Sequence, residues 1–473
     1  MNGNKKMELL GSAPISKALL AMGIPTMLGM MVNALYNLVD AYFVGGLGTS
    51  QMGAISVVYP LGQVVVGLGL LFGNGAASYI SRLLGNGNKD TANKVANTAL
   101  FSSIAVGAVM IFFSVIFLTP ILNLLGATES ILPYAKTYAT IYIISCIFNV
   151  FNVTMNNIVT SEGAAKTTMC ALMSGAVLNI ALDPICIYVL HWGVAGAAIA
   201  TAISQVVSTM IYLIYLLRKK SVFHFNIKEC CYSKEIMSEI FKIGIPTLVF
   251  QLLTSLSISL INTQAKVYGD SVIAGMGAVT RLISMGSLMV FGFIKGFQPI
   301  AGYSYGAKKI DRLCKAIKVS ILWSTAFCLI YGIVIALCAA PIISGFTSDD
   351  MKMIQVGETA LRANGLSFIL FGFYTVYSSL FLALGKGKEG FFLGACRQGI
   401  CFIPIILILP LLFGINGILY AQPVSDVLSA VITIFMALKL HRELFSSGFG
   451  NSILTVHHNQ DNSENVVDQL KQS

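Results

Sequence analysis

Long apolar runs separated by short polar segments dominate this chain. Twelve of these runs reach the length of about 20 residues that an α-helix needs to cross about 30 Å of hydrocarbon. Six runs fall in each half of the chain, and several are long enough to require a tilted or bent helix. We predict membrane-spanning helices over residues 15–44, 51–81, 95–119, 133–160, 167–190, 194–217, 236–265, 272–302, 313–340, 354–383, 389–412 and 416–439.

The two halves of the chain resemble each other in sequence. The segment 23–26 (GIPT) recurs at 244–247 (GIPT), and 193–196 (GVAG) recurs at 414–417 (GING). The separation is the same in both cases, because 244 − 23 equals 414 − 193, and we call it the repeat offset. Six spans per repeat is an even number, so both repeats have the same orientation and a pseudo-twofold axis should run along the membrane normal. We therefore predict an all-α polytopic membrane protein with twelve transmembrane helices in two pseudosymmetric six-helix lobes.

The polar segments define the predicted domain organisation. The longest polar stretch inside the membrane region joins the sixth span to the seventh, where the repeat starts again. Near the end of the chain too few apolar residues remain to offset the entropy of ordering. We predict a cytoplasmic N-terminal segment (1–14), an N-lobe (15–217), a cytoplasmic linker (218–233), a C-lobe (234–441) and a disordered cytoplasmic tail (442–473).

Composition and charge agree with a membrane protein. Charged residues are 11% of the chain, against about 25% in an ordinary soluble domain. The net charge is +10, but Lys and Arg concentrate on one side of the predicted spans, with little beyond Lys266 and Lys352 on the other. This asymmetry argues against a nucleic-acid partner. It predicts that both termini are cytoplasmic and that the protein lies in the cell inner (plasma) membrane. The first run is too long for a signal-peptide core, and the ten cysteines lack metal-ligand spacing, so we expect free thiols.

Acidic residues inside the apolar runs are the candidates for function, because a carboxylate near the bilayer centre costs roughly 2.5–3.5 kcal/mol. In the first span, Asn33, Tyr36, Asn37 and Asp40 lie on one helical face. A stripe of four polar side chains is not expected to face lipid. We therefore predict that it faces the interior of the lobe.

A second acidic residue lies in the fifth span. Asn179 and Asp183 are four residues apart, directly before Pro184, which breaks the helix and exposes oxygen atoms as ligands. At about 1.5 Å per residue, Thr201 of the sixth span lies at a depth similar to the two carboxylates. The alternative is that these groups only hold helices together by hydrogen bonds. We predict a site for Na⁺ or a proton relay from Asp40, Asn179, Asp183 and Thr201, supported by Asn33, Tyr36 and Asn37, and no other metal.

Other charged residues have less certain roles. Arg281 and Lys295 in the eighth span could provide counter-charge, or could lie against lipid. Asp426 in the twelfth span shares a helical face with an amide and two serines, and could line a second polar pocket or serve packing. Glu162 and Arg397 lie near the predicted cytoplasmic ends of their spans, where we expect solvation at the membrane interface.

Motifs of soluble chemistry are missing, so we expect neither an enzyme nor a cofactor. The chain has no G-x-x-x-x-G-K-[ST], H-E-x-x-H or G-x-S-x-G sequence. An intramembrane enzyme would need a nucleophile with its base or a metal cluster, and His191 is the one histidine of the membrane region. The duplicated apolar units, with carboxylates confined to a few places, instead indicate a transporter with two pseudosymmetric lobes. A flippase for a lipid-linked precursor and a passive receptor or scaffold remain alternatives.

Five short motifs together form a specific signature. They are GIP at 23–25 together with Asp40, ISRLLG at 80–85, LNIALDP at 178–184, GFQP at 296–299 and YGA at 305–307. With these motifs the chain resembles the multidrug and toxic compound extrusion (MATE) family, in its prokaryotic MepA-like branch of multidrug pumps. The likeness covers about residues 12–442.

This resemblance implies a two-lobe exporter that exchanges H⁺ or Na⁺ for lipophilic cationic drugs or dyes. It implies that Asp40, Asn179, Asp183 and Thr201 form the cation site of the N-lobe and that Pro25 is the bending point of the first span. Pro184, which breaks the fifth span, is our own prediction for a second hinge. Some branches of the family carry acidic residues in helices seven and ten, where this chain has Thr254 and no acid in mid-span. Coupling should therefore depend on the N-lobe. The expected partners are drugs and membrane lipids, and the expected state is a monomer.

Overall fold

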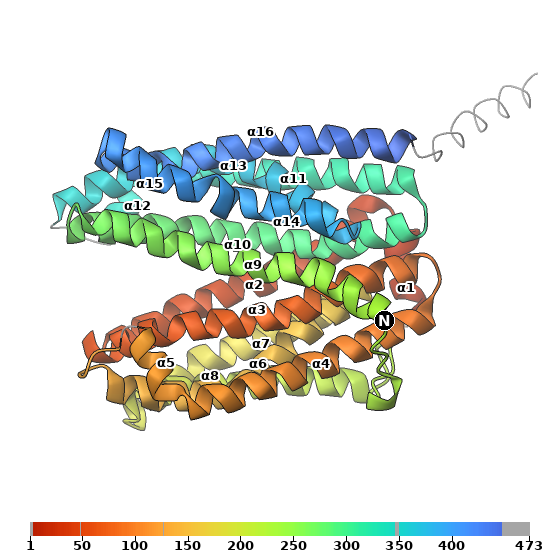
Figure 1. Cartoon of the computed structure of the whole chain (residues 1–473), viewed down its shortest axis with the longest axis horizontal. Helices are drawn as coiled ribbons and strands as arrows, with labels where there is room; N and C mark the ends of the chain where they lie inside the picture. The colour runs from red at the N-terminus through yellow and green to blue at the C-terminus, as the bar shows by residue number, and fades with distance from the viewer. Residues whose placement is uncertain (1–2, 48, 126, 346–349, 447–473) are drawn as a thin grey trace, which may run out of the picture.

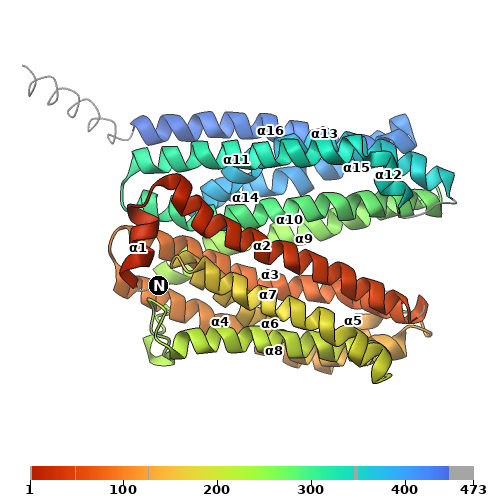
Figure 2. The same cartoon turned by 180° about the vertical axis from the view of Figure 1, so that it is seen from behind.

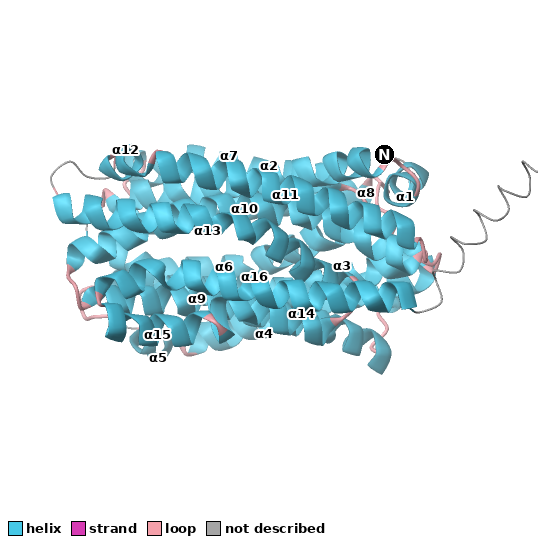
Figure 3. Ribbon diagram, turned by 90° about the horizontal axis from the view of Figure 1, so that it is seen from above, coloured by secondary structure: helices cyan, strands magenta, loops and turns pink. Residues whose placement is uncertain are grey.

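The protein is an all-helical bundle in the part of the chain that the structure describes, and Figure 3 shows it without a strand. The computed structural model describes residues 3–47, 49–125, 127–345 and 350–446. The helices of the first half are α1 (Gly3–Gly11), α2 (Ile15–Gly45), α3 (Thr49–Gly85), α4 (Lys89–Ile116), α5 (Leu118–Leu124), α6 (Leu132–Ser161), α7 (Ala165–Pro184), η1 (Ile185–Val189) and α8 (Gly193–Leu217). The second half contains η2 (Ile227–Glu229), α9 (Lys234–Lys266), α10 (Asp270–Gly306), α11 (Ile310–Leu337), α12 (Ala339–Ser344), α13 (Met351–Ala383), α14 (Gly387–Ala395), η3 (Cys396–Ile400), α15 (Phe402–Phe413) and α16 (Ile415–Ser446).

Twelve helical segments among the described residues are long and apolar enough to cross a membrane, which confirms the predicted number of spans. The boundaries differ where helices continue into polar sequence. α4 begins at Lys89 rather than at 95, because the Asn88 side chain caps the helix by accepting a hydrogen bond from the Thr91 amide at 3.1 Å. α16 runs to Ser446, beyond the predicted end of the twelfth span at 439. Most of the predicted disordered tail, 447–473, lies outside the described residues.

The two halves of the chain form two helical groups that lie side by side, α2–α8 and α9–α16, as Figures 1 and 2 show. We use the names N-lobe and C-lobe for these two groups, and the predicted lobe boundaries stay predictions. They converge at the end where α1 lies, and they diverge toward the end where α5 and α12 lie (Figure 1). We call these the α1 end and the opposite end.

Glycines related by the repeat form the contact between the lobes. A Cβ on Gly75 would lie 2.3 Å from the carbonyl oxygen of Ile240 in α9, and a Cβ on Gly296 would lie 2.5 Å from the backbone nitrogen of Gly23 in α2. Gly75 and Gly296 are separated by the repeat offset, because 296 − 75 equals 244 − 23. Each repeat therefore presses its second long helix against the first long helix of the other, which is the geometry expected of a pseudo-twofold axis between the lobes.

Polar side chains add to this contact. Arg82 of α3 forms an ion pair with Glu239 of α9 at 2.6 Å, and Asn74 donates a hydrogen bond to the hydroxyl of Thr247 at 2.9 Å. Ser78 donates to the carbonyl oxygen of Leu382 in α13 at 2.5 Å. All three α3 residues lie in the half of that helix near the α1 end, so the lobes are held together there.

The short helix α1, which the sequence patterns did not predict, joins the two lobes. Its Lys6 side chain is buried and forms an ion pair with Glu162 of the N-lobe at 3.2 Å. At its C-terminal end, Arg312 of the C-lobe donates hydrogen bonds to backbone carbonyls of α1 and the following turn, including Leu10 at 3.0 Å and Ala13 at 2.5 Å. Glu162 is fully buried, so the expectation that it is solvated at the membrane interface is wrong.

Candidate functional site

The predicted site residues lie on three helices that pack together in the N-lobe. Asp40 lies in the last two turns of α2, and α2 packs against α7, which in turn packs against α8. Asp183 occupies the last turn of α7, which ends at Pro184 and continues as the π-helical turn η1. The helix break predicted from Pro184 is therefore present as a change of helix type, of the kind that often occurs at functional sites.

The structure brings the four predicted cation-site residues together. The Asn179 amide nitrogen Nδ2 lies 3.4 Å from Asp183 Oδ1 and 3.4 Å from Thr201 Oγ1. The carboxyl groups of Asp40 and Asp183 lie within hydrogen-bonding reach of each other. Residues from three separate helices thus converge on one point, as similar depth and shared helical faces predicted.

Several oxygen atoms of this cluster lack a donor. Asp40 Oδ1, Asn179 Oδ1 and Asp183 Oδ2 are buried and accept no hydrogen bond from any described residue. A buried acceptor without a partner costs about 1–3 kcal/mol, and more when it is charged. Two carboxylates this close also repel each other unless a proton or a metal cation lies between them. The donor set of two carboxyls, an amide oxygen and a hydroxyl consists of the hard oxygen ligands that a small cation prefers.

Tyrosines surround the carboxyl pair. Tyr36 of α2 and Tyr138 of α6 both lie near enough to interact electrostatically with Asp40 and Asp183. Tyr36 was predicted as a supporting group, whereas Tyr138 was not, because only the packing of α6 reveals its proximity. Asn33 lines the neighbouring pocket. The side chain of Asn37 lies outside the described residues.

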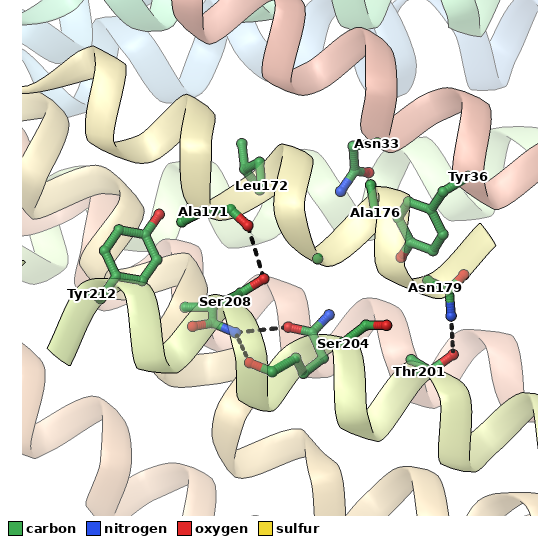
Figure 4. Close-up of a pocket in the computed structure, with 13 residues that line it drawn as sticks. Asn33, Tyr36, Ala171, Leu172, Ala176, Asn179, Thr201, Ser204, Ser208 and Tyr212 are labelled. Carbon is green, nitrogen blue, oxygen red and sulfur yellow. Dashed lines mark hydrogen bonds between the residues drawn. The ribbon is translucent and has the colours of Figure 1, made fainter. Parts of the chain in front are cut away.

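A polar pocket extends from this cluster along the inside of the N-lobe (Figure 4). Asn33, Tyr36, Asn179 and Thr201 lie at one end of it and Tyr212 at the other, and Figure 4 shows Asn179 bonded to Thr201 within it. The lining residues that the predicted site did not include are Asn152, Ala171, Leu172, Gly175, Ala176, Ser204, Gln205, Ser208 and Tyr212.

Hydrogen bonds link the α8 side of the pocket to α6. Asn152 Nδ2 donates to the side-chain oxygen of Gln205 at 2.8 Å, and its own Oδ1 accepts from Thr209 at 3.0 Å. Thr201, Gln205 and Ser208 follow one another at helical spacing along one face of α8. That spacing is a signal in the sequence that could have extended the predicted site beyond Thr201.

The remaining charged candidates lie elsewhere. Arg281 is exposed, Lys295 is half-buried, and neither forms an ion pair with a described residue. Arg397, which we expected to be solvated at the interface, is instead buried in the C-lobe, where its Nε donates to Asp426 Oδ1 at 2.8 Å. That expectation was wrong because the sequence places Arg397 along its helix but does not show the carboxylate on the neighbouring helix.

Comparison with known proteins identifies the family. The family model MatE matches the chain twice, over residues 25–185 and 246–408, which together make up more than half of it. The chain belongs to the MatE family. The starts of the two MatE matches, 25 and 246, are separated by the repeat offset.

Relatives of this MatE protein extend over nearly its whole length. The multidrug export protein MepA of Staphylococcus aureus (strain NCTC 8325 / PS 47) is 29% identical over 450 residues, covering 93% of this chain and 97% of its own. MepA of Staphylococcus haemolyticus is 30% identical over 431 residues, covering 91% and 95%. A solved structure described as the outward-facing conformation of a multidrug resistance MATE family transporter is 26% identical, with a TM-score of 0.89 and coverage of 94% and 99%. The predicted MATE fold is confirmed, and the chain is a multi-pass membrane protein.

Proposed function

We propose that this MatE protein is a secondary active multidrug efflux antiporter, which exports lipophilic organic cations in exchange for H⁺ or Na⁺ by alternating access. The names of its MepA relatives support the multidrug substrate class. The observation that carries the ion coupling is the carboxyl pair of Asp40 and Asp183, together with three buried oxygens of the cluster that have no donor among the described residues.

In this mechanism the coupling ion enters the cluster of Asp40, Asn179, Asp183 and Thr201. A bound cation removes the repulsion between the two carboxylates, so α2 and α7 can approach each other. Pro25 lies inside α2 and Pro184 ends α7 beside the site, and each removes a backbone donor where its helix would need to bend. Binding at the cluster would thereby be transmitted to the lobe interface, where α2 packs against α10.

The orientation follows from the basic residues. We place the α1 end in the cytoplasm of a cell inner (plasma) membrane, because Lys and Arg concentrate in the segments at that end. With the lobes joined at the α1 end and diverging at the opposite end, this structure corresponds to the state in which the exporter releases its drug outside. The transporter would act as a monomer, in contact with membrane lipids along its exposed apolar helices.

A flippase for a lipid-linked precursor is the alternative from the same superfamily architecture. Such a substrate carries phosphate groups and favours basic residues around its binding site. The residues that line the N-lobe pocket include polar, aromatic and aliphatic side chains but no Lys or Arg. This pocket therefore offers no basic group to a phosphate, and the carboxyl groups of Asp40 and Asp183 beside it favour a cationic substrate or ion.

The test is ethidium efflux from energised cells that lack their own multidrug pumps. Cells would express the wild type, Asp40→Asn, Asp183→Asn or the exposed control Asp90→Asn at matched membrane levels. We expect efflux by the wild type and the control and none by the two site variants. Repeating the assay with and without Na⁺ identifies the ion. Normal efflux by Asp183→Asn would refute the coupling site, and no efflux by the wild type would favour the flippase.

A further inference from the structure

A buried ion pair lies in the C-lobe, between α13, η3 and α16. Asp426 Oδ1 accepts hydrogen bonds from Arg397 Nε and from Gln422 Nε2, both at 2.8 Å, and Asp426 Oδ2 accepts one from Ser367 at 2.8 Å. The guanidinium of Arg397 also lies over the ring of Phe371, with 4.5 Å from Cζ to the ring centroid. The exposed fractions of the Arg397 and Asp426 side chains are 7% and 4%. Both charges are thus removed from solvent and paired with each other.

The internal repeat makes this cluster the counterpart of the polar pocket of the N-lobe. At the repeat offset, Gln422, Ser425 and Asp426 of α16 correspond to Thr201, Ser204 and Gln205 of α8. All three of those α8 residues line the N-lobe pocket. The two segments align without a gap from 193 and 414 onward, because both begin with the repeated G-x-x-G sequence.

In the C-lobe, the Arg397 side chain occupies the space that corresponds to the N-lobe pocket. Its counterpart falls at the small residues Gly175 and Ala176 of α7, which both line the N-lobe pocket. Ala176 is related to it by the repeat offset, and Gly175 lies at the same distance from the start of its helix, because α7 begins at Ala165 and α14 begins at Gly387. Where the N-lobe has small side chains and open space, the C-lobe has the longest basic side chain. The carboxylate oxygens of Asp426 have donors, whereas Asp40 Oδ1 and Asp183 Oδ2 accept no hydrogen bond from the part of the chain that the structure describes.

We propose that the Arg397 guanidinium is a tethered cation that fills the C-lobe counterpart of the N-lobe pocket and thereby confines ion binding to the N-lobe. Without this side chain, Asp426 is the anionic ligand of a latent site for a monovalent metal cation such as Na⁺. The hydroxyl of Ser367 and the side-chain oxygen of Gln422 complete a set of hard oxygen ligands. Arg397 is therefore a specificity-determining residue that sets how many ions the transporter binds.

This inference deepens the proposed function, which assigns ion coupling to the N-lobe, but its test does not depend on transport. The experiment uses full-length protein in mild detergent, in an Asp40→Asn, Asp183→Asn background that removes the N-lobe carboxylates. Three chains are compared in that background: Arg397 intact, Arg397→Ala, and Arg397→Ala with Asp426→Asn. Thermal unfolding is measured at pH 8 while NaCl replaces choline chloride at constant ionic strength.

We expect the midpoint of the Arg397→Ala chain to rise with Na⁺, on the order of 2 °C at about ten times the dissociation constant. The chain with intact Arg397 and the chain that also carries Asp426→Asn should show no such rise. A midpoint of Arg397→Ala that stays constant as Na⁺ replaces choline would overturn the proposal.

Removing Arg397 leaves the buried Asp426 carboxylate without its partner, so the Arg397→Ala chain can fail to fold in choline chloride. In that case size-exclusion chromatography in the two salts tests whether Na⁺ replaces the guanidinium. A monodisperse peak that appears in Na⁺ but not in choline supports the proposal. Aggregation of Arg397→Ala in both salts, while the chain with the added Asp426→Asn stays monodisperse, contradicts it, because no metal cation then replaces the guanidinium.

Discussion

Glu162 is the residue whose replacement should destabilise the protein most clearly. Its carboxylate accepts hydrogen bonds from Lys6 Nζ at 3.2 Å, Ser221 Oγ at 2.9 Å and the Val222 amide at 2.6 Å, and a further one from Tyr215. Glu162→Gln keeps the shape of the side chain but leaves the buried Lys6 ammonium without its counter-charge. Removing one partner of a buried ion pair costs about 3–5 kcal/mol. Taking about 2 °C per kcal/mol for a large domain, we expect the unfolding midpoint to fall by roughly 6–10 °C.

The assay is the fraction of monodisperse protein that remains after heating in detergent, since membrane proteins of this size commonly unfold irreversibly. Glu129→Gln makes the same exchange at an exposed position and should leave the midpoint unchanged. Adding Lys6→Met to Glu162→Gln removes the uncompensated charge and should recover part of the loss. A midpoint for Glu162→Gln within about one degree of the wild type would refute this reasoning, because it would mean that Lys6 keeps its charge satisfied without Glu162.

Three further changes have defined outcomes. Gly75→Ala places a Cβ 2.3 Å from the Ile240 carbonyl oxygen and should lower the unfolding midpoint. Gly277→Ala should not, because its Cβ would lie more than 4 Å from every described atom outside its chain neighbours and the nearby backbone of its own helix. Equal midpoints would contradict the tight lobe contact. Asn179→Ala removes the amide that hydrogen-bonds to Asp183 and Thr201, so we expect a roughly tenfold rise in the ion concentration that gives half-maximal efflux. An unchanged concentration would argue against a direct ligand role of Asn179. Pro25→Ala should give a protein with a wild-type midpoint and slower ethidium efflux, and wild-type efflux would exclude the hinge.

The helical framework could be predicted because its signals are local. Twelve apolar runs of membrane-spanning length and the internal repeat determine the number of helices and the symmetry of the two lobes. α1 could not be predicted in this way, because its role depends on contacts of Lys6 with Glu162 and of Arg312 with the carbonyl of Leu10, which join residues far apart in the chain. α4 starts earlier than predicted because Asn88 caps it, and a search for apolar periodicity does not detect a polar capping residue.

The candidate site was predictable to the extent that helix geometry determines it. Depth and helical face were sufficient to group Asp40, Asn179, Asp183 and Thr201, because each lies on a regular helix at a calculable height. The pairing of Arg397 with Asp426 was not predictable, because the register of η3 against α16 depends on the packing of the C-lobe. The functional roles of all these residues and the boundaries of the lobes stay predictions until they are tested.

The central claim is that an ion bound at Asp40 and Asp183 drives the export of an organic cation. The most direct measurement reconstitutes the purified protein in liposomes and follows tetraphenylphosphonium accumulation against imposed Na⁺ or pH gradients, with the membrane potential clamped to zero. We predict accumulation by the wild type with one of the two gradients and none by Asp183→Asn, while Asp90→Asn behaves as the wild type. Equal accumulation by Asp183→Asn and the wild type would contradict the account.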